Sequence, residues 1–142
     1  MNLAHYSCFS DNDFYTYKFF SEGPKGRIKK IIRYTKIGDD PVIYNLGFGD
    51  EDNITGEIDD QAISNNNDRN IVLATVAYTV NDFINHHPVN FLFAKGNTPV
   101  KTRLYQMCIS SIIDEIKRDF ELYGLRKRNW NRFTKNVNYD VF

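Results

Sequence analysis

Residues 14–34 have the sequence FYTYKFFSEGPKGRIKKIIRY, and this stretch decides the predicted fold. Its first part, Phe14–Phe20, is rich in the aromatic and β-branched residues that favour strands. Its last part, Arg27–Tyr34, predicts a second strand. Two glycines and a proline lie between the two parts and favour a turn. Because the separation is short, the stretch predicts an antiparallel hairpin.

The next part of the chain predicts a third strand and then a long loop. A turn at residues 38–41 leads into a strand at residues 42–48, so the first three strands form a meander. Residues 49–68 are rich in Asp, Asn and Gly and have almost no periodicity, which indicates a loop with at most one short strand at residues 57–59. A loop of this length is uncommon in a compact domain and is often functional or mobile.

A first helix is predicted from Asp68, as the N-cap residue, to about residue 85. Its apolar residues fall at i, i+4 and i+8 spacing, and the sequence His86-His87-Pro88 ends it because proline disfavours helical geometry at the residue before it. Residues 90–94 predict a fourth strand.

A second, longer helix is predicted to begin with Thr98 as N-cap and Pro99 at the first helical position. Gly124 fits the position just past its end. The basic, aromatic tail at about residues 125–142 comes after it, with a short strand expected at residues 139–142.

The predicted fold class is therefore α+β. The element order β-β-β-α-β-α indicates an antiparallel sheet of about four strands with two helices packed on one face. The length of 142 residues fits a single domain, residues 1–142.

Composition argues for a soluble protein with two charged surfaces. The N-terminus has no basic and apolar segments of a signal peptide, and no apolar run is long enough to span a membrane, so a cytoplasmic location is expected. The net charge of zero argues against a protein that coats nucleic acid over its whole surface. The charges are nevertheless segregated: residues 25–36 carry six basic and no acidic residues, and residues 39–68 carry nine acidic residues and no Lys or Arg.

The basic hairpin and the tail suggest a surface for single-stranded nucleic acid. Such surfaces combine aromatic rings that stack on bases with cations that contact phosphates. The candidate residues in the hairpin and in the tail are Tyr15, Tyr17, Lys29, Arg33, Arg126, Arg128 and Trp130. In the alternative interpretation, the aromatic side chains belong to the core and the charges keep an edge strand soluble.

The acidic loop suggests a site for a divalent cation. Asp50, Asp59 and Asp60 come after the third strand, and carboxylates that lie close together favour a bound cation. Their spacing does not fit the calcium loop of an EF-hand. The alternative is a solvated acidic loop, since Asp, Asn and Gly also form turns. No other cofactor is predicted.

Lys101 and Arg103 suggest an anion site at the start of the second predicted helix. Cations are unfavourable at a helix N-terminus unless an anion neutralises them. The anion could be an external phosphate or carboxylate, or an acidic side chain of the acidic loop.

Four stretches resemble a family of short bacterial proteins of unknown function. They are YNLGFGD (44–50), IDD (58–60), NNNDRNIVLATVA (65–77) and GNTPVKTRLYQ (96–106). The resemblance covers nearly the whole chain and implies a self-contained single domain, but no activity, cofactor or catalytic residue.

We therefore expect a non-enzymatic binding or interaction module, with single-stranded nucleic acid as the first candidate ligand. One alternative is a homodimeric protein-interaction module in which the acidic loop of one subunit meets the basic strands of the other. The other is a metal-assisted hydrolase that uses the acidic loop. No nucleophile, base and orienting residue form a recognisable catalytic set in the sequence.

Overall fold

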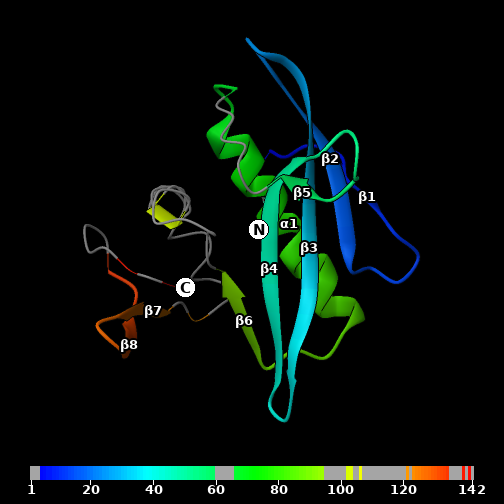
Figure 1. The fold of residues 1–142 in the computed structure, drawn as a ribbon. Coiled ribbons are helices and arrows are strands. Elements are labelled where there is room, and N and C mark those ends of the chain that lie inside the picture. Colours follow the sequence, from blue (N-terminus) through cyan, green and yellow to red (C-terminus); the bar gives the residue numbers. More distant parts are fainter. Residues whose placement is uncertain are drawn as a thin grey trace.

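A long meander of three antiparallel strands forms the centre of the computed structural model (Figure 1). The structure describes residues 4–59, 66–94, 102–103, 106, 121, 123–134, 139 and 141. In chain order, its elements are β1 (Phe9–Ser10), β2 (Thr16–Gly23), β3 (Gly26–Asp39), β4 (Val42–Glu51), β5 (Ile58–Asp59), α1 (Arg69–His86), β6 (Phe91–Ala94), β7 (Tyr123–Arg126) and β8 (Asn129–Arg132).

The predicted hairpin is present as β2 and β3. The two strands are joined through Pro24 and Lys25, with Gly23 opposite Gly26. Alternate residues of β2 point to opposite faces of the sheet. Tyr17 and Phe19 are buried on one face, and Thr16, Lys18 and Phe20 therefore lie on the other. This second face points away from α1 and is the outer face of the sheet.

The third and fourth predicted strands are also present, as β4 and β6. β4 pairs antiparallel with β3 and completes the meander. The prediction of an all-antiparallel sheet is wrong, because β6 pairs parallel with β4, with Tyr44 opposite Leu92. The helix α1 lies between β4 and β6 in the chain and supplies the crossover that a parallel pair needs.

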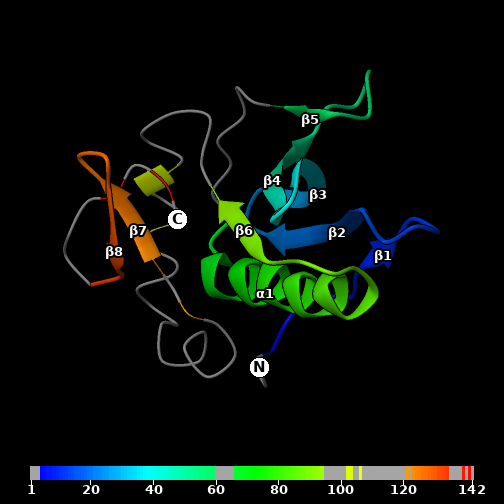
Figure 2. The same cartoon turned by 90° about the horizontal axis from the view of Figure 1, so that it is seen from below.

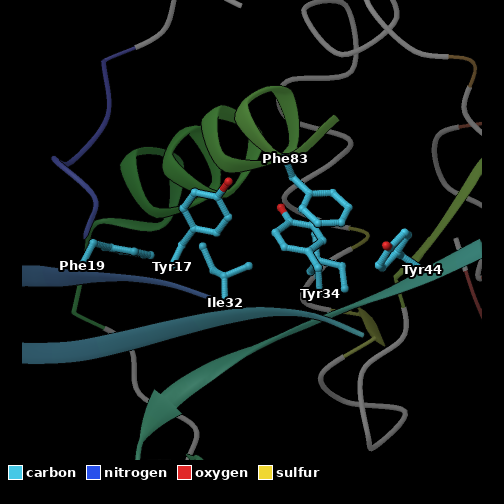
Figure 3. Close-up of a cluster of buried hydrophobic side chains, with 7 residues drawn as sticks. Tyr17, Phe19, Ile32, Tyr34, Tyr44 and Phe83 are labelled. Atoms are coloured by element: carbon cyan, nitrogen blue, oxygen red, sulfur yellow. The ribbon is translucent and has the colours of Figure 1, made fainter. Parts of the chain in front are cut away.

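The first predicted helix is α1, and it packs on one face of the sheet (Figure 2). Its Phe83 ring stacks on Tyr34 of β3 with 4.1 Å between ring centroids. The cluster in Figure 3 fills the space between helix and sheet with aromatic rings from β2, β3 and β4.

Two buried threonines of α1 use their hydroxyls both inside the helix and outside it. The hydroxyl of Thr75 donates to the carbonyl oxygen of Ile71 at 2.7 Å, and that of Thr79 donates to the carbonyl oxygen of Val76 at 2.7 Å. Both hydroxyls are also used outside the helix. Oγ1 of Thr75 accepts from the backbone N–H of Tyr6 at 2.9 Å, and that of Thr79 bonds the hydroxyl of Tyr34 at 2.8 Å.

Asp68 occupies the predicted N-cap position, but its side chain does not cap the helix. Instead, its Oδ2 atom accepts hydrogen bonds from the hydroxyls of Tyr6 and Ser21. Asn66, which is buried, donates to Ser21 and to the carbonyl oxygen of Gly26. This polar network joins the N-terminal segment, the start of α1 and the β2–β3 turn.

The predicted layout of four strands and two helices is corrected by the structure. One sheet has six strands, β1 to β6, and β7 and β8 form a separate hairpin. The second predicted helix lies mostly outside the described residues. Within its predicted range, Thr102, Arg103 and Gln106 are described and are helical.

Gly124, which is predicted just past the end of a helix, lies inside β7. A Cβ atom there would be 2.3 Å from the ring of Tyr139, so a glycine is required by the close approach of this ring.

The predicted acidic loop is partly a hairpin. β4 continues to Glu51 and pairs with β5, which confirms the short strand expected near residues 57–59. Between the strands, the Asp52 carboxylate accepts from the backbone N–H groups of Ile54 and Thr55. These hydrogen bonds lower the pKa of Asp52 below its usual value. Residues 60–65 lie outside the described residues.

No helix among the described residues combines the length and the hydropathy that crossing a bilayer requires.

Candidate nucleic-acid interface

The four candidate residues of the β2–β3 hairpin do not share one face. Tyr17 is only 2% exposed and lies under α1, where its hydroxyl donates to Oδ2 of Asp82 at 2.7 Å. Burial and then this hydrogen bond raise the pKa of Tyr17 above its ordinary range. Lys29 and Arg33 lie on the outer face, because Lys29 is opposite Phe20 and Arg33 is opposite Thr16. Tyr17 is therefore a core residue.

Tyr15 also lies on the side of α1, at the edge of the core. Its ring stacks on the imidazole of His87 with 4.3 Å between centroids and has a tilted contact with Phe83. The alternative interpretation as a core residue therefore describes Tyr17, whereas Tyr15 is 36% exposed at the edge of the core.

The outer face carries four basic side chains of the hairpin, whereas Lys30, which is opposite Phe19, lies on the side of α1. Arg27 lies over the ring of Phe20, with 4.0 Å from the guanidinium carbon to the ring centroid. Lys18, Lys29 and Arg33 lie further along the same face. Each of these three cations is paired with an acidic side chain of the β4–β5 hairpin.

The β4–β5 hairpin lies on the side of the sheet opposite α1 (Figure 2). Ile58 of β5 packs over the glycines of β4. A Cβ atom at Gly49 would be 2.8 Å from Cγ2 of Ile58, and one at Gly47 would be 3.3 Å from Cδ1. Ile31, which is opposite Gly49 in the register, is fully buried although it points away from α1. The hairpin therefore covers this part of the outer face.

Glu51 holds two of the cations under the hairpin. Its carboxylate lies 2.9 Å from Nζ of Lys18 and 3.0 Å from Nζ of Lys29, and its side chain is only 9% exposed. The hydrogen bond from Lys18, with that from Lys29, lowers the pKa of Glu51 below its ordinary value. These contacts fix the start of the hairpin on the outer face.

Glu57 holds the third cation, Arg33, through an ion pair between its Oε2 atom and Nη1 of the guanidinium. The Glu57 side chain is 64% exposed and that of Arg33 is 32% exposed. The carboxylate of this pair is therefore open to solvent, whereas the carboxylate of Glu51 is not. The backbone of Glu57 is held by a hydrogen bond in which the N–H of Asp52 donates to the carbonyl oxygen of Glu57 at 2.8 Å.

Trp130, predicted from the tail, reaches the same sheet from a separate hairpin. It lies on β8, and its indole packs on the ring of Phe93 with 5.7 Å between centroids. Phe93 points to the outer face, because its neighbour Leu92 packs against the core on the other face. Trp130 is 45% exposed. The sheet and the tail therefore share an aromatic step, formed by Phe93 and Trp130.

The tip of the β7–β8 hairpin carries three successive cations, Arg126, Lys127 and Arg128. All three are exposed, and no ion pair of theirs occurs within the part of the chain that the structure describes. Lys127 and Arg128 form the two-residue connection and have φ angles of 51° and 67°. Positive φ at both positions is typical of a type I′ turn, which usually contains Asn-Gly.

Phe93 was not among the predicted site residues. It lies in the fourth predicted strand, residues 90–94, for which the sequence prediction does not say which face of the sheet each side chain is on. Alternation along β6 is the signal that could have found it, since Leu92 belongs with the core and Phe91 and Phe93 with the other face.

The predicted metal residues are only partly brought together. Asp50 and Asp59 are directly opposite each other on β4 and β5. Asp50 forms an ion pair with Lys30, which is itself buried. Asp60 lies outside the described residues, among which no group of three potential metal ligands occurs.

Of the two residues of the predicted anion site, the structure describes only Arg103. Arg103 is helical and exposed, and Lys101 lies outside the described residues. The described part of the chain therefore does not define an anion site at this position.

Taken together, the fold and the surface define a sheet-dominated α+β protein whose outer face joins a basic, aromatic hairpin. The chain belongs to DUF6934, a family of unknown function, whose family model matches residues 2–142. This match confirms the resemblance to a family of unknown function over essentially the whole chain. No curated protein and no solved structure matches the chain.

Proposed function

We propose that this protein is a binding module for single-stranded nucleic acid, with its contact surface at the β7–β8 tip and the step formed by Phe93 and Trp130. One observation carries the proposal: the β7–β8 hairpin carries both a half-exposed tryptophan and three exposed cations without acidic partners among the described residues. Proteins that bind single strands use this combination of stacking and phosphate contact.

The backbone of the tip supports a functional role for its cations. A non-glycine residue at positive φ costs roughly 1 kcal/mol, and the turn contains two of them. Glycine or asparagine would relieve this cost. The chain instead has Lys127 and Arg128, which place two charges at the outermost point of the hairpin.

The bound strand can continue from the aromatic step across the outer face to Arg33. Phe93 is opposite Asn45, Asn45 is opposite Thr35, and Arg33 is two residues further along β3. With the usual spacing of strands and residues, the Cα atoms of Phe93 and Arg33 are roughly 12 Å apart. A few nucleotides span this distance, so Arg33 remains part of the proposed surface. Lys29 is four residues further along β3, beyond the buried Ile31, and pairs with Glu51.

The intrinsic fluorescence of Trp130 tests this proposal directly, because it is the only tryptophan in the chain. Titration with a single-stranded oligothymidine at low salt is expected to quench the emission, since bases stack on the indole. Affinity should fall steeply as salt is raised, because counterions are released from the phosphates. An unchanged emission spectrum and no binding by a second method at low salt would refute the proposal.

An abasic oligonucleotide of the same length is the matched ligand control. It keeps the phosphates and lacks the bases, so it should bind more weakly by roughly 1–3 kcal/mol for each base that stacks. Equal affinity for both ligands would mean that the surface recognises polyanions only.

A protein partner is the second candidate, and the exposed apolar side chains favour it. Phe91 on β6, Ile37 on β3 and Ile54 in the β4–β5 turn are all exposed. The charge complementarity that suggested a homodimer is, however, used within the chain, where Glu51, Glu57 and Asp50 pair with basic residues of β2 and β3. Light scattering at low and high salt measures whether a dimer forms.

A further inference from the structure

We infer that Glu57 is a built-in competitor for the phosphate site at Arg33, so that the β4–β5 hairpin limits the affinity of the outer face for nucleic acid. The inference rests on the proposed function and adds a regulatory contact to it. Its basis is the pair between the exposed Glu57 carboxylate and the Arg33 guanidinium.

Arg33 is the exchangeable cation of the three under the hairpin. Lys18 and Lys29 share the nearly buried carboxylate of Glu51, and freeing either of them would expose that carboxylate or leave it with one partner. Glu57 is exposed and lies in the turn region just before β5, so its side chain can rotate into solvent. A phosphate can then take its place on the guanidinium.

The Glu57 carboxylate and a phosphate group can accept hydrogen bonds from the Arg33 guanidinium in the same way. An arginine guanidinium binds carboxylate and phosphate oxygens with the same planar set of N–H donors. A carboxylate on the surface also repels an approaching phosphate backbone. Glu57 therefore opposes binding in two ways, by occupying Arg33 and by its negative charge.

The Glu57→Gln variant tests this inference in the oligothymidine titration of Trp130. The change keeps the shape of the side chain and the backbone hydrogen bond of Glu57. An exposed ion pair is weak, so affinity should rise roughly two- to fivefold. One further phosphate contact should also steepen the dependence of log Kd on log salt concentration by about 0.7.

Glu22→Gln is the matched control for charge alone. Glu22 is 68% exposed, lies on the same face and pairs with Arg27 at 3.9 Å, so its substitution changes the net charge by the same amount. It is six residue pairs away from Arg33 along the β2–β3 ladder, which is roughly 20 Å. It should change the affinity less than Glu57→Gln does.

The double variant Arg33→Gln, Glu57→Gln shows whether Glu57 acts through Arg33. The inference predicts that it binds like Arg33→Gln alone, so that the gain from Glu57→Gln disappears. A gain of the same size in both backgrounds, or equal gains from Glu57→Gln and Glu22→Gln, would overturn it. If the natural protein binds and Glu57→Gln binds no more tightly, only this inference fails. If neither binds, the proposed function fails with it.

Discussion

Two aromatic residues of β2 show how similar side chains take different roles on the two faces of a strand. Tyr17 points to α1 and donates to Asp82, whereas Phe20, of similar size, lies under Arg27 on the outer face. The sequence identifies both as aromatic strand residues, but only the position of α1 decides which one is buried. For this reason the sequence alone leaves open whether Tyr17 lies on the surface with Lys29 and Arg33 or in the core, where the structure places it.

Tyr17→Phe should lower stability without changing the binding of oligothymidine. The ring remains in the core, but Asp82 loses its donor, and we expect a loss of about 1 kcal/mol in the free energy of unfolding. Denaturant unfolding measures this loss. Tyr34→Phe is the matched control: its partner Thr79 keeps a hydrogen bond to Val76, so it should cost less. Weaker oligonucleotide binding by Tyr17→Phe, with stability unchanged, would return Tyr17 to the binding surface.

Glu51 makes the stability of the chain sensitive to acid. Its pKa in the folded state is lowered, first by the hydrogen bond from Lys18, so the carboxylate stabilises the fold fully above its ordinary pKa of 4.5. This contribution is lost as the pH falls through the lowered pKa. Glu51→Gln should therefore be less stable at pH 7, by about 1 kcal/mol, and the difference should close below pH 4.5.

Unfolding in urea between pH 7 and pH 3 measures the two stabilities. A difference between the natural protein and Glu51→Gln that stays constant over this range would show that the carboxylate does not stabilise the fold through its charge.

At the scale of elements, the β7–β8 turn combines a cost in stability with exposed charge. Replacing Lys127 and Arg128 by Asn and Gly should relieve the positive φ angles and stabilise the chain by about 1 kcal/mol, which is a rise in Tm of roughly 3–5 °C. Calorimetry measures the shift. The matched variant with Gln at both positions removes the same charges and keeps the unfavourable backbone, so its Tm should not rise. Equal Tm values for the two variants would contradict the assigned turn.

The strands that are close together in the chain could be predicted from the sequence, and those whose pairing depends on distant elements could not. The β2–β3 hairpin, β4, β6 and α1 all lie where periodicity and turn residues placed them. β6 pairs parallel with β4 because α1 carries the chain back across the sheet between them. The prediction of an antiparallel sheet rests on strands coming first and helices later in the chain, and it does not consider this crossover. β7 and β8 were missed because their turn, Lys127-Arg128, lacks the usual Asn-Gly signal.

At the scale of the whole molecule, the segregated charges are largely used inside the fold. The basic stretch at residues 25–36 and the acidic stretch after it face each other through β3 and the β4–β5 hairpin, with Lys29, Lys30 and Arg33 paired to Glu51, Asp50 and Glu57. Charge counts locate both stretches but do not show that they meet. The basic residues at the tail tip have no such partner among the described residues, and we propose that they bind an external anion.

Oligothymidine binding by the double variant Lys127→Asn, Arg128→Gly is the most direct test of the proposed surface. Loss of affinity in this variant cannot come from unfolding, since its Tm is expected to rise. We predict that it loses at least about tenfold in affinity at low salt, because two phosphate contacts are removed, and that the variant with Gln at both positions loses as much. Binding as tight as that of the natural protein would contradict the proposed surface.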